Sequence, residues 1–422
     1  MRTIYIMVLL LLAVCMYAQQ PDTLLLKDCH EEAIRLYPLT RQRSLLGEVT
    51  ELKIRSLQTS YLPQLFLNGQ ASWQSEVTEI PFDVPFIQIP SVDRDMYRMT
   101  LDVQQLIWDG GSKRHQQEIE KVGLQIGQKG LEAELYSLKE RISQLYFSIL
   151  LFQQNSRILL SVLEQLTEQQ AMLEAGVRHG LVLAGQRDVL LAEIMKTNQE
   201  LLELESGKQA GLDMLGVFLD RSMPSDLVLK LPDIPDIREE AVSQRLEPLV
   251  MELKQQQLEL TKNLSVSKYL PKISAFAQAG YGKPGLNMLK REFDDFYMVG
   301  ARFQWNIWNW NQQKRDKQGL DLQKDIISTQ RETFDRNLTM NLRNLAAMIL
   351  KNERLLEKDD EIIRLRSNIT RMAAAQLGNG VITPGDYVTE LKQESIARLN
   401  KENHYIQLIR TKIEYLTVLG KY

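Results

Sequence analysis

Few residues of this sequence combine a type and a spacing that could do covalent or metal chemistry. Cys29 and His30 are adjacent, and the pair is most simply explained as the start of a helix. There is no glycine loop of the kind that binds phosphate and no nucleophile elbow. The histidines are scattered, without the spacing of a metal site: His30, His115, His179 and His404. The sequence therefore predicts neither an enzyme nor a metal or cofactor site.

The composition narrows the classes of protein that remain. Of 422 residues, 44% are hydrophobic and 25% are charged, so the chain can bury a sizeable core and is neither disordered nor collagen-like. The formal net charge is -3 and there is no basic run. Both observations argue against a nucleic-acid partner.

Residues 1–18 have the layout of a secretory signal peptide. One arginine precedes an apolar run over residues 4–14, and Ala18 is the small residue before the cleavage point. This run is too short to span a bilayer as a helix, and no later run is long enough. We therefore expect an exported protein that contacts a membrane without apolar helices. Cleavage would leave one cysteine and no intrachain disulfide, and the alternative is lipidation at Cys15 within "LAVC", although Val14 stands where a small residue is expected.

The mature sequence contains one plan twice. We assign a first structural repeat to residues 19–221, a linker to 222–240 and a second repeat to 241–422. Three matches carry the duplication, at offsets of 208, 200 and 200 residues: Tyr61-Leu62-Pro63 with Tyr269-Leu270-Pro271, Ile107-Trp108-Asp109 with Ile307-Trp308-Asn309, and Gly180 and Gly185 with Gly380 and Gly385.

Each repeat is predicted to contain a helix, two strands and a long helical hairpin. We expect the first helices at about 23–58 and 238–265, and the hairpins at about 111–219 and 311–420. The first hairpin has a heptad seam, which indicates left-handed supercoiling against other helices. A soluble coiled coil would explain this seam equally well. The residues of the seam are Leu131, Leu135, Leu138, Ile142, Leu145, Ile149, Phe152, Leu159, Leu163, Leu166 and Leu173.

Four segments alternate apolar and polar residues at every step. They lie at about 61–75, 97–108, 269–281 and 297–308. Half-buried strands of a soluble sheet could produce any one of them. Four such runs of ten or more residues, after a signal peptide, favour tilted strands that span a membrane.

The alternation separates a face towards lipid from a face towards a lumen. Leu101 and Ala277 belong to the lipid face, where an arginine should be costly, whereas Thr100 and Gln278 belong to the opposite face, where it should be tolerated. Aromatic residues near the strand ends are typical of the belts where a barrel meets lipid headgroups. The predicted interface residues are Trp73, Tyr97, Trp108, Tyr281, Tyr297, Trp305 and Trp308.

Four strands cannot form a closed barrel, and an open sheet edge is excluded from hydrocarbon. Two copies would give eight strands, whose interior side chains fill, whereas three would give twelve with room for an aqueous passage. The polar inner faces favour three. The sequence thus predicts an α+β membrane protein with a duplicated helix–strand–strand–helix–helix repeat and four strands per chain in a trimeric transmembrane β-barrel.

In order and spacing, these features resemble the TolC-like outer-membrane efflux proteins. The resemblance rests on the duplicated "YLP", on "LIWDGG", on "GNGVITPGDYVTELKQESIARL" and on the ending "YLTVLGKY". It implies a homotrimer in the outer membrane, with a twelve-stranded barrel continued by a helical coiled-coil barrel across the periplasm. It also implies a periplasmic adaptor and an inner-membrane transporter of RND or ABC type. The implied function is a passive exit duct for efflux or type I secretion; the alternative is a structural or surface protein, anchored by a barrel, that transports nothing.

The resemblance further implies a carboxylate constriction at the periplasmic tip. Asp386 matches one acidic position, while the second expected position is Thr389, with Glu390 adjacent. Asp386 could equally serve only its own helix, because an acid at a helix N-terminus complements the dipole. We expect Arg178 and Arg187 as candidate gate partners. The tip turns are not equivalent, since the first is two residues longer; they contain Gly180, Gly185 and Asp188, and Gly380, Pro384 and Gly385.

Overall fold

The computed structural model describes residues 23–77, 93–180, 182–233, 243–288 and 290–422. The predicted signal peptide, Cys15 and part of the predicted linker lie outside these described residues.

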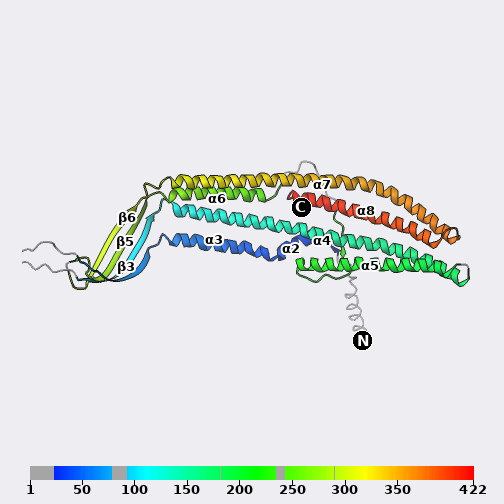
Figure 1. Cartoon of the computed structure of the whole chain (residues 1–422), viewed down its shortest axis with the longest axis horizontal. Helices are drawn as coiled ribbons and strands as arrows, with labels where there is room; N and C mark the ends of the chain where they lie inside the picture. The colour runs from blue at the N-terminus through cyan, green and yellow to red at the C-terminus, as the bar shows by residue number, and fades with distance from the viewer. Residues whose placement is uncertain (1–22, 78–92, 181, 234–242, 289) are drawn as a thin grey trace, which may run out of the picture. The chain divides into compact units, whose positions relative to one another are not determined.

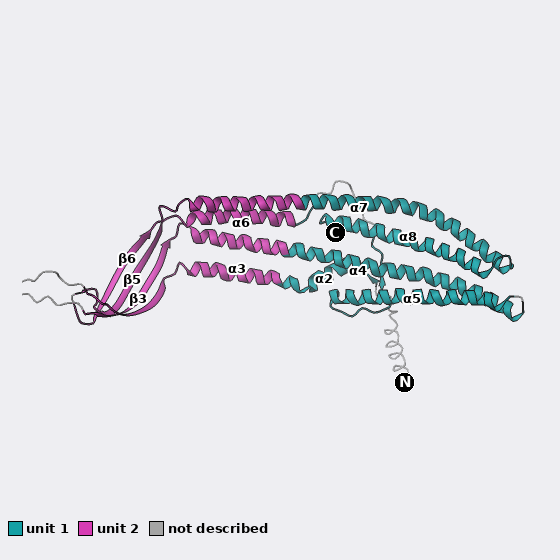
Figure 2. Cartoon of the chain, in the orientation of Figure 1, with its two compact units in different colours: residues 1–41, 131–246, 334–422 teal, residues 42–130, 247–333 magenta. Residues whose placement is uncertain are grey.

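The chain divides into two compact units (Figure 2). A helical unit comprises residues 1–41, 131–246 and 334–422, and a sheet unit comprises residues 42–130 and 247–333. Each unit takes segments from both sequence repeats. The repeats therefore describe the duplication of the sequence, whereas the compact units combine matching parts of the two copies.

The sheet unit contains a four-stranded antiparallel sheet, three of whose strands are labelled side by side in Figure 1. It also contains α3 (Gln42–Thr59), α6 (Glu247–Ser267) and the proximal parts of α4 (Ser112–Arg178) and α7 (Gln312–Gly378). The strand order is β2, β3, β5, β6, so that among the described residues β2 and β6 each have a partner on one side only. The strands are β2 (Gln64–Trp73), β3 (Asp95–Trp108), β5 (Lys272–Lys283) and β6 (Asp294–Gln304). The four strands expected from the alternation are confirmed, although β2 and β5 begin after the Tyr-Leu-Pro segments instead of within them.

The passage from strand to long helix requires a left-handed backbone. In the first repeat Gly110 and Gly111 have φ of 72° and 80°, which costs glycine little. The carboxylate of Asp109 then accepts hydrogen bonds from the backbone N–H groups of Gly111 and Lys113, both at 3.0 Å, and so starts α4 (Ser112–Arg178). The second repeat makes the same turn with non-glycine residues, Trp310 and Asn311, at φ of 52° and 60° before α7 (Gln312–Gly378).

The prediction of one continuous helix over 23–58 is wrong. Two helices, α2 (Leu26–Leu36) and α3 (Gln42–Thr59), are separated by a 3₁₀ turn that begins at Pro38. Proline disfavours helical geometry in the residue before it, and Tyr37 is extended, with ψ of 129°. The matching helix of the second repeat, α6 (Glu247–Ser267), starts later than the predicted residue 238.

In the helical unit α2, α5 (Ala184–Leu219), α8 (Pro384–Val418) and the distal part of α4 pack around one core. Two short strands, β1 (Thr23–Leu24) and β4 (Val228–Leu229), pair in parallel and contribute Leu24 and Leu229 to this core. The distal part of α7 belongs to the same unit and contributes to a second buried cluster near the tips. The buried hydroxyl of Tyr146 donates to the carbonyl oxygens of Leu24, at 2.8 Å, and Lys230, at 2.5 Å. Tyr146 therefore ties the beginning of the chain and the predicted linker to α4.

The predicted heptad seam is buried in this unit. Within α4 the most buried seam residues are Leu131, Leu138, Ile142, Ile149, Leu159, Leu166 and Leu173. A glycine of α5 lets the helices approach closely, because a Cβ on Gly211 would lie 2.6 Å from Cγ1 of Ile149. Among the described helices, none is both long enough and apolar enough to cross a bilayer.

Candidate functional site

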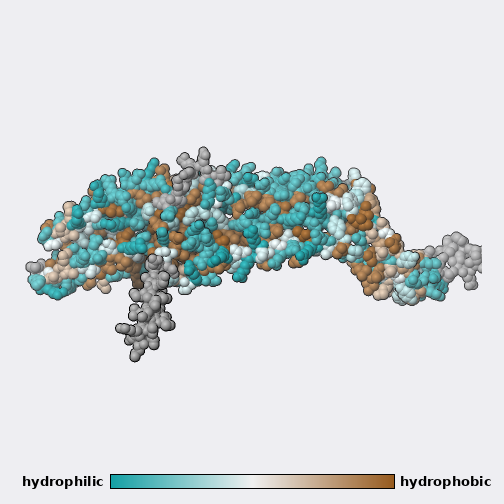
Figure 3. Space-filling view, turned by 180° about the vertical axis from the view of Figure 1, so that it is seen from behind, coloured by the Kyte–Doolittle hydropathy of each residue, from teal (hydrophilic) through white to brown (hydrophobic). Residues whose placement is uncertain are grey.

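The strand register produces one continuous apolar face on the sheet. Residues paired across a ladder point to the same side, and the apolar residues of all four strands fall into common rows. Two central rows are Leu65 with Val103, Ala277 and Val299, and Leu67 with Leu101, Ala279 and Tyr297. Tyr297 is 81% exposed, Val299 75% and Leu67 66%, and Figure 3 shows apolar side chains gathered over the strands. A soluble sheet would cover such a face with another layer.

The opposite face is polar and held together at one carboxylate. Asp102 on β3 accepts hydrogen bonds from the side chains of Asn68 on β2 and Gln278 on β5, each at 2.5 Å, and from Thr100 at 3.0 Å. Thr100 and Gln278 both belong to this polar face, as predicted. Thr100 is only 5% exposed, however, so an arginine there would displace packed neighbours instead of being tolerated.

Six of the seven predicted interface aromatics lie towards the two ends of the strands, whereas Tyr297 lies in a central row of the apolar face. At the end joined by the strand connections, Phe293 lies between Tyr281, with ring centres 5.4 Å apart, and Tyr97, at 6.1 Å. Trp73 ends β2 in the same region, opposite Asp95. The sequence reasoning missed Phe293, although its position just before an alternating strand could have shown it.

The helix end of the sheet carries a second aromatic group. Trp108 ends β3, and the indole N–H of Trp305 donates to the carbonyl of Tyr269 at 3.2 Å. Trp308 and Trp310 pack edge to face, with ring centres 5.8 Å apart, and are 70% and 76% exposed. Two aromatic groups on either side of an apolar band are typical of transmembrane barrels.

Asp386 makes a capping box at the second tip turn. Thr383 is the N-cap of α8; its hydroxyl accepts from the backbone N–H of Asp386 at 3.3 Å and donates to the carboxylate at 2.7 Å. The same carboxylate accepts from the backbone N–H of Thr383 at 2.9 Å. These hydrogen bonds, with the Thr383 side chain foremost, lower the pKa of Asp386. The side chain remains exposed, so its charge is available to other groups.

Glu390 lies one turn further along α8 and is held by α7. Its carboxylate pairs with the guanidinium of Arg366 at 3.2 Å, and its carbonyl accepts from the hydroxyl of Thr370 at 3.3 Å. Asp386 and Glu390 thus have separate partners in this chain. Both acids therefore pair within the second hairpin, which α7 and α8 form.

The arginines of the first tip turn also pair within their own hairpin. Arg187 donates two hydrogen bonds to the carboxylate of Asp188, at 2.7 and 3.0 Å, and lies 3.8 Å from Glu174. These acids raise the pKa of Arg187, and the hydrogen bond to Asp188 contributes most. Arg178 lies 3.9 Å from the same Glu174. No ion pair of the described residues joins either arginine to Asp386.

A buried cluster joins the two hairpins near their tips. Tyr387, next to Asp386, is 2% exposed and packs with Leu166 and Leu190 of the first hairpin. Burial foremost, and then the charges of Glu394 and Glu168, raise the pKa of the Tyr387 phenol to about 12. Sequence reasoning missed Tyr387, because the turn motif drew attention to the acid beside it.

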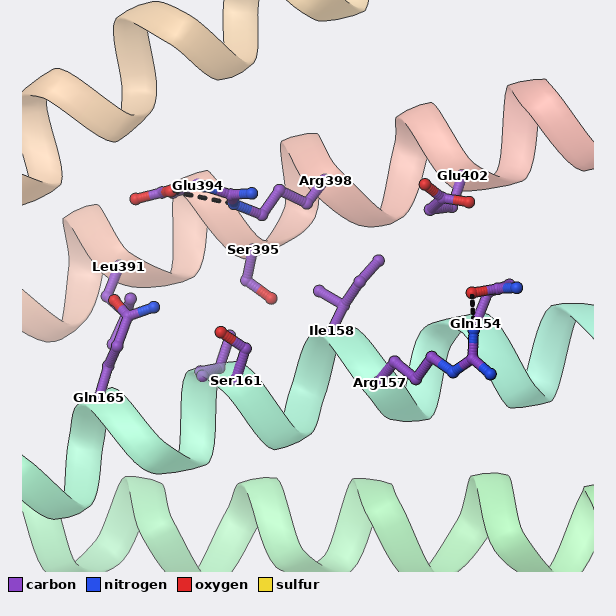
Figure 4. Close-up of a pocket in the computed structure, with 11 residues that line it drawn as sticks. Gln154, Arg157, Ile158, Ser161, Gln165, Leu391, Glu394, Ser395, Arg398 and Glu402 are labelled. Carbon is purple, nitrogen blue, oxygen red and sulfur yellow. Dashed lines mark hydrogen bonds and ion pairs between the residues drawn. The ribbon is translucent and has the colours of Figure 1, made fainter. Parts of the chain in front are cut away.

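A polar groove runs between α4 and α8 in the helical unit, with a cavity of about 200 Å³ (Figure 4). Buried Glu394 accepts two hydrogen bonds from Arg398, at 2.6 and 3.0 Å. Arg157 projects from the facing helix and donates to Gln154 at 3.3 Å. The groove therefore presents charges of both signs beside amides and hydroxyls.

Cys29 and His30 belong to the core of the helical unit. The ring of His30 hydrogen-bonds Ser143 at 3.0 Å, and burial, followed by the charge of Lys139, lowers its pKa to about 4. Burial raises the pKa of the Cys29 thiol to about 12. No group of three metal-ligating side chains occurs among the described residues.

The chain resembles solved outer-membrane channels over nearly its whole length. Against VceC from Vibrio cholerae the TM-score is 0.69 at 13% identity, covering 94% of this chain and 96% of that one. The CmeC channel of Campylobacter jejuni gives 0.67 at 15% identity over 94% and 85% of the two chains. The MtrE channel of Neisseria gonorrhoeae, solved in an open state, gives 0.69 at 15% identity over 94% and 88%.

No protein-family model matches the sequence, and no curated protein does either. The likeness to the solved channels therefore shows the fold. The predicted TolC-like fold, with long helices, four antiparallel strands per chain and a duplicated helix–strand–strand–helix pattern, is confirmed.

Proposed function

We propose that this chain is one protomer of a homotrimeric channel in the bacterial outer membrane. One observation carries the proposal: the sheet exposes a continuous apolar face across all four strands, while its polar side chains share the other face. The strands have 10, 14, 12 and 11 residues, which suits tilted strands crossing a bilayer. Lipid would cover the apolar face, and the polar face would line the passage.

The two outer strands supply the argument for assembly. Unpaired N–H and C=O groups on β2 and β6 would be exposed to hydrocarbon in a single chain. Pairing β2 of one copy with β6 of the next satisfies both edges. Three copies then close a barrel of twelve strands, wide enough for an aqueous lumen.

The function that this assembly supports is a passive exit duct. The solved channels of this fold are described as outer-membrane channels, and the resemblance implies service to an adaptor and an inner-membrane transporter of RND or ABC type. We assign adaptor docking to the polar groove between α4 and α8, whose mixed charges suit a polar helical partner. The transporter would supply the energy, and the duct itself would do no chemistry.

We place the periplasmic constriction at Asp386 and Glu390. The carboxylate of Asp386 caps α8, and in the trimer the same carboxylate would face the channel axis. Because the side chain is exposed, it can both cap the helix and act in the constriction. Arg178 and Arg187 could partner this constriction only by leaving Glu174 and Asp188. A closed tip is therefore better attributed to the apolar contacts of Tyr387 with the first hairpin.

Ion conductance tests this proposal. Purified protein is reconstituted in a planar bilayer at 1 M KCl, and single-channel currents are recorded for the wild type and for Tyr387→Ala, which removes the largest buried side chain between the hairpins. We expect discrete conductance steps in both proteins, with longer or larger openings in Tyr387→Ala. Protein that inserts in the bilayer yet passes no current in either form would instead identify a structural anchor.

A further inference from the structure

The polar face of the sheet contains the same three-layer stack twice. In each stack a glycine backbone lies beneath a phenylalanine ring, and an arginine guanidinium covers the ring. The first stack consists of Gly280, Phe296 and Arg98, and the second of Gly300, Phe276 and Arg302. The register sets Gly280 opposite Phe296 and Gly300 opposite Phe276, so the two stacks are reciprocal pairs on β5 and β6.

Glycine is required under both rings. A Cβ on Gly280 would collide with the ring of Phe296, and one on Gly300 would lie 2.8 Å from the ring of Phe276. Phe296 is only 8% exposed although it lies on the polar face. The rings therefore lie flat on the sheet and act as platforms, a known use of glycine opposite an aromatic residue.

Each guanidinium lies on its platform instead of beside an acid. The guanidinium carbon is 5.7 Å from the ring centre in both stacks, a cation–π distance. Within the described parts of the chain, neither Arg98 nor Arg302 has an ion pair, and both are exposed. The cation–π contact uses no hydrogen-bond acceptor, so the guanidinium N–H groups remain available to another partner.

The acids of the same face are already engaged. Asp102, in the middle of the sheet, accepts hydrogen bonds from three neutral side chains. Asp294 pairs with Lys290 at 3.0 Å. In register with β5, Arg98 lies opposite Gly282 and Arg302 opposite Ser274. The two arginines therefore mark separate levels, on either side of Asp102.

We propose that Arg98 and Arg302 form two anion-binding levels inside the barrel, so that the channel favours anionic cargo. This inference rests on the proposed function, because it needs three copies around one lumen, with three guanidinium groups at each level. Carboxylate, sulfate and phosphate groups fit the guanidinium fork, with two N–H groups donating to one anion. The platforms hold the forks in place, and rings of arginine select anions in pores.

Ion selectivity at low salt tests the proposal. Reversal potentials are measured in a KCl gradient centred near 0.01 M, where the Debye length is roughly 30 Å, and again near 1 M, where it is roughly 3 Å. At low salt we expect Arg98→Gln, Arg302→Gln and the double variant to shift the reversal potential towards the potassium potential, with the largest shift in the double variant. The shifts should disappear at high salt.

Two control variants separate charge from structure. Gln70→Ala removes a neutral side chain in register with Arg98, and its reversal potential should match that of the wild type. Arg98→Lys keeps the charge without the fork, and it should keep the anion preference. Unchanged reversal potentials in both glutamine variants, in channels that conduct, would overturn the proposal.

A measurement on the wild type needs no variant to assemble. Inorganic tripolyphosphate, a multivalent anion, is added at low salt to the side of the strand connections. We expect current block that 1 M KCl relieves, and its absence would contradict the anion levels. A wild-type protein that passes no current at any salt concentration would instead contradict the proposed channel.

Discussion

Arginine substitutions at two adjacent residues of β5 test which face of the sheet meets lipid. Ala277 lies in a central apolar row, between Val103 and Val299, whereas Gln278 lies on the polar face beside Asp102. The substitutions Ala277→Arg and Gln278→Arg add the same side chain at the same depth in the bilayer. They differ only in the face to which the arginine is added.

The expected penalty at Ala277 follows from its position. An arginine on the lipid face near the midplane costs about 2–4 kcal/mol, and every 1.4 kcal/mol is tenfold in an equilibrium constant. Ala277→Arg should therefore lower the folding equilibrium of one protomer by roughly 30- to 700-fold. At Gln278 an arginine meets the lumen and can donate to Asp102 in place of the amide, so we expect a change within about 1 kcal/mol.

The assay is refolding into phospholipid vesicles followed by urea titration, with assembled trimer counted on semi-native gels. The wild type and Gln278→Arg should give similar midpoints, and Ala277→Arg should give a lower midpoint and less trimer. Thr100 is unsuitable as the polar-face control because its burial would add a packing cost. Equal losses from the Ala277 and Gln278 variants would refute the assignment of the faces.

Three further predictions concern the helical hairpins and the core. Hydrogen bonds lower the pKa of Asp386 from its ordinary value of 3.8, so the capping box should stabilise the tip fully above about pH 4 and lose that contribution as pH falls through the lowered pKa. Asp386→Asn should abolish this pH dependence in hydrogen exchange of the tip amides, and a profile like that of the wild type would contradict the stabilising role of the carboxylate. Gly211→Ala should destabilise the protein by about 1–3 kcal/mol, because the new methyl group meets Ile149. Gly319→Ala, on α7 with open space around it, should instead stabilise the protein by roughly 0.4–1 kcal/mol, and urea unfolding that ranks the two variants the other way would refute the close packing of α5 on α4. Cys29, fully buried with a pKa of about 12, should not react with a thiol reagent at pH 8 until urea unfolds the protein, and rapid labelling in native buffer would show that the core opens.

The elements with strict periodicity could be predicted from the sequence. Period-two alternation located all four strands and placed Ala277 and Gln278 on opposite faces, since side chains along a strand alternate. The seam through Leu138, Ile142 and Ile149 indicated the buried side of α4 for the same kind of reason. Both patterns arise from residues close together in sequence, and the structure contains the strands and the buried helix side that they predict.

The remaining features depend on contacts between segments far apart in sequence. The break at Pro38 was readable, yet the apolar pattern on either side of it suggested one helix. Thr100 lies in register with Gly280, and the ring that covers this glycine belongs to Phe296, on a strand nearly two hundred residues away from Thr100. Tyr387 is similarly buried by a different hairpin. Periodicity within one segment contains no information about such neighbours.

The central claim is that three copies close one barrel through β2 and β6. Native mass measurement of the purified full chain in detergent tests it most directly, since the open edges leave no stable state for a single sheet in a hydrophobic environment. We predict one dominant species with three times the mass of the chain, which persists on dilution. A stable monomer, or a dimer that does not convert to a larger species, would contradict the closure of the barrel and the channel built on it.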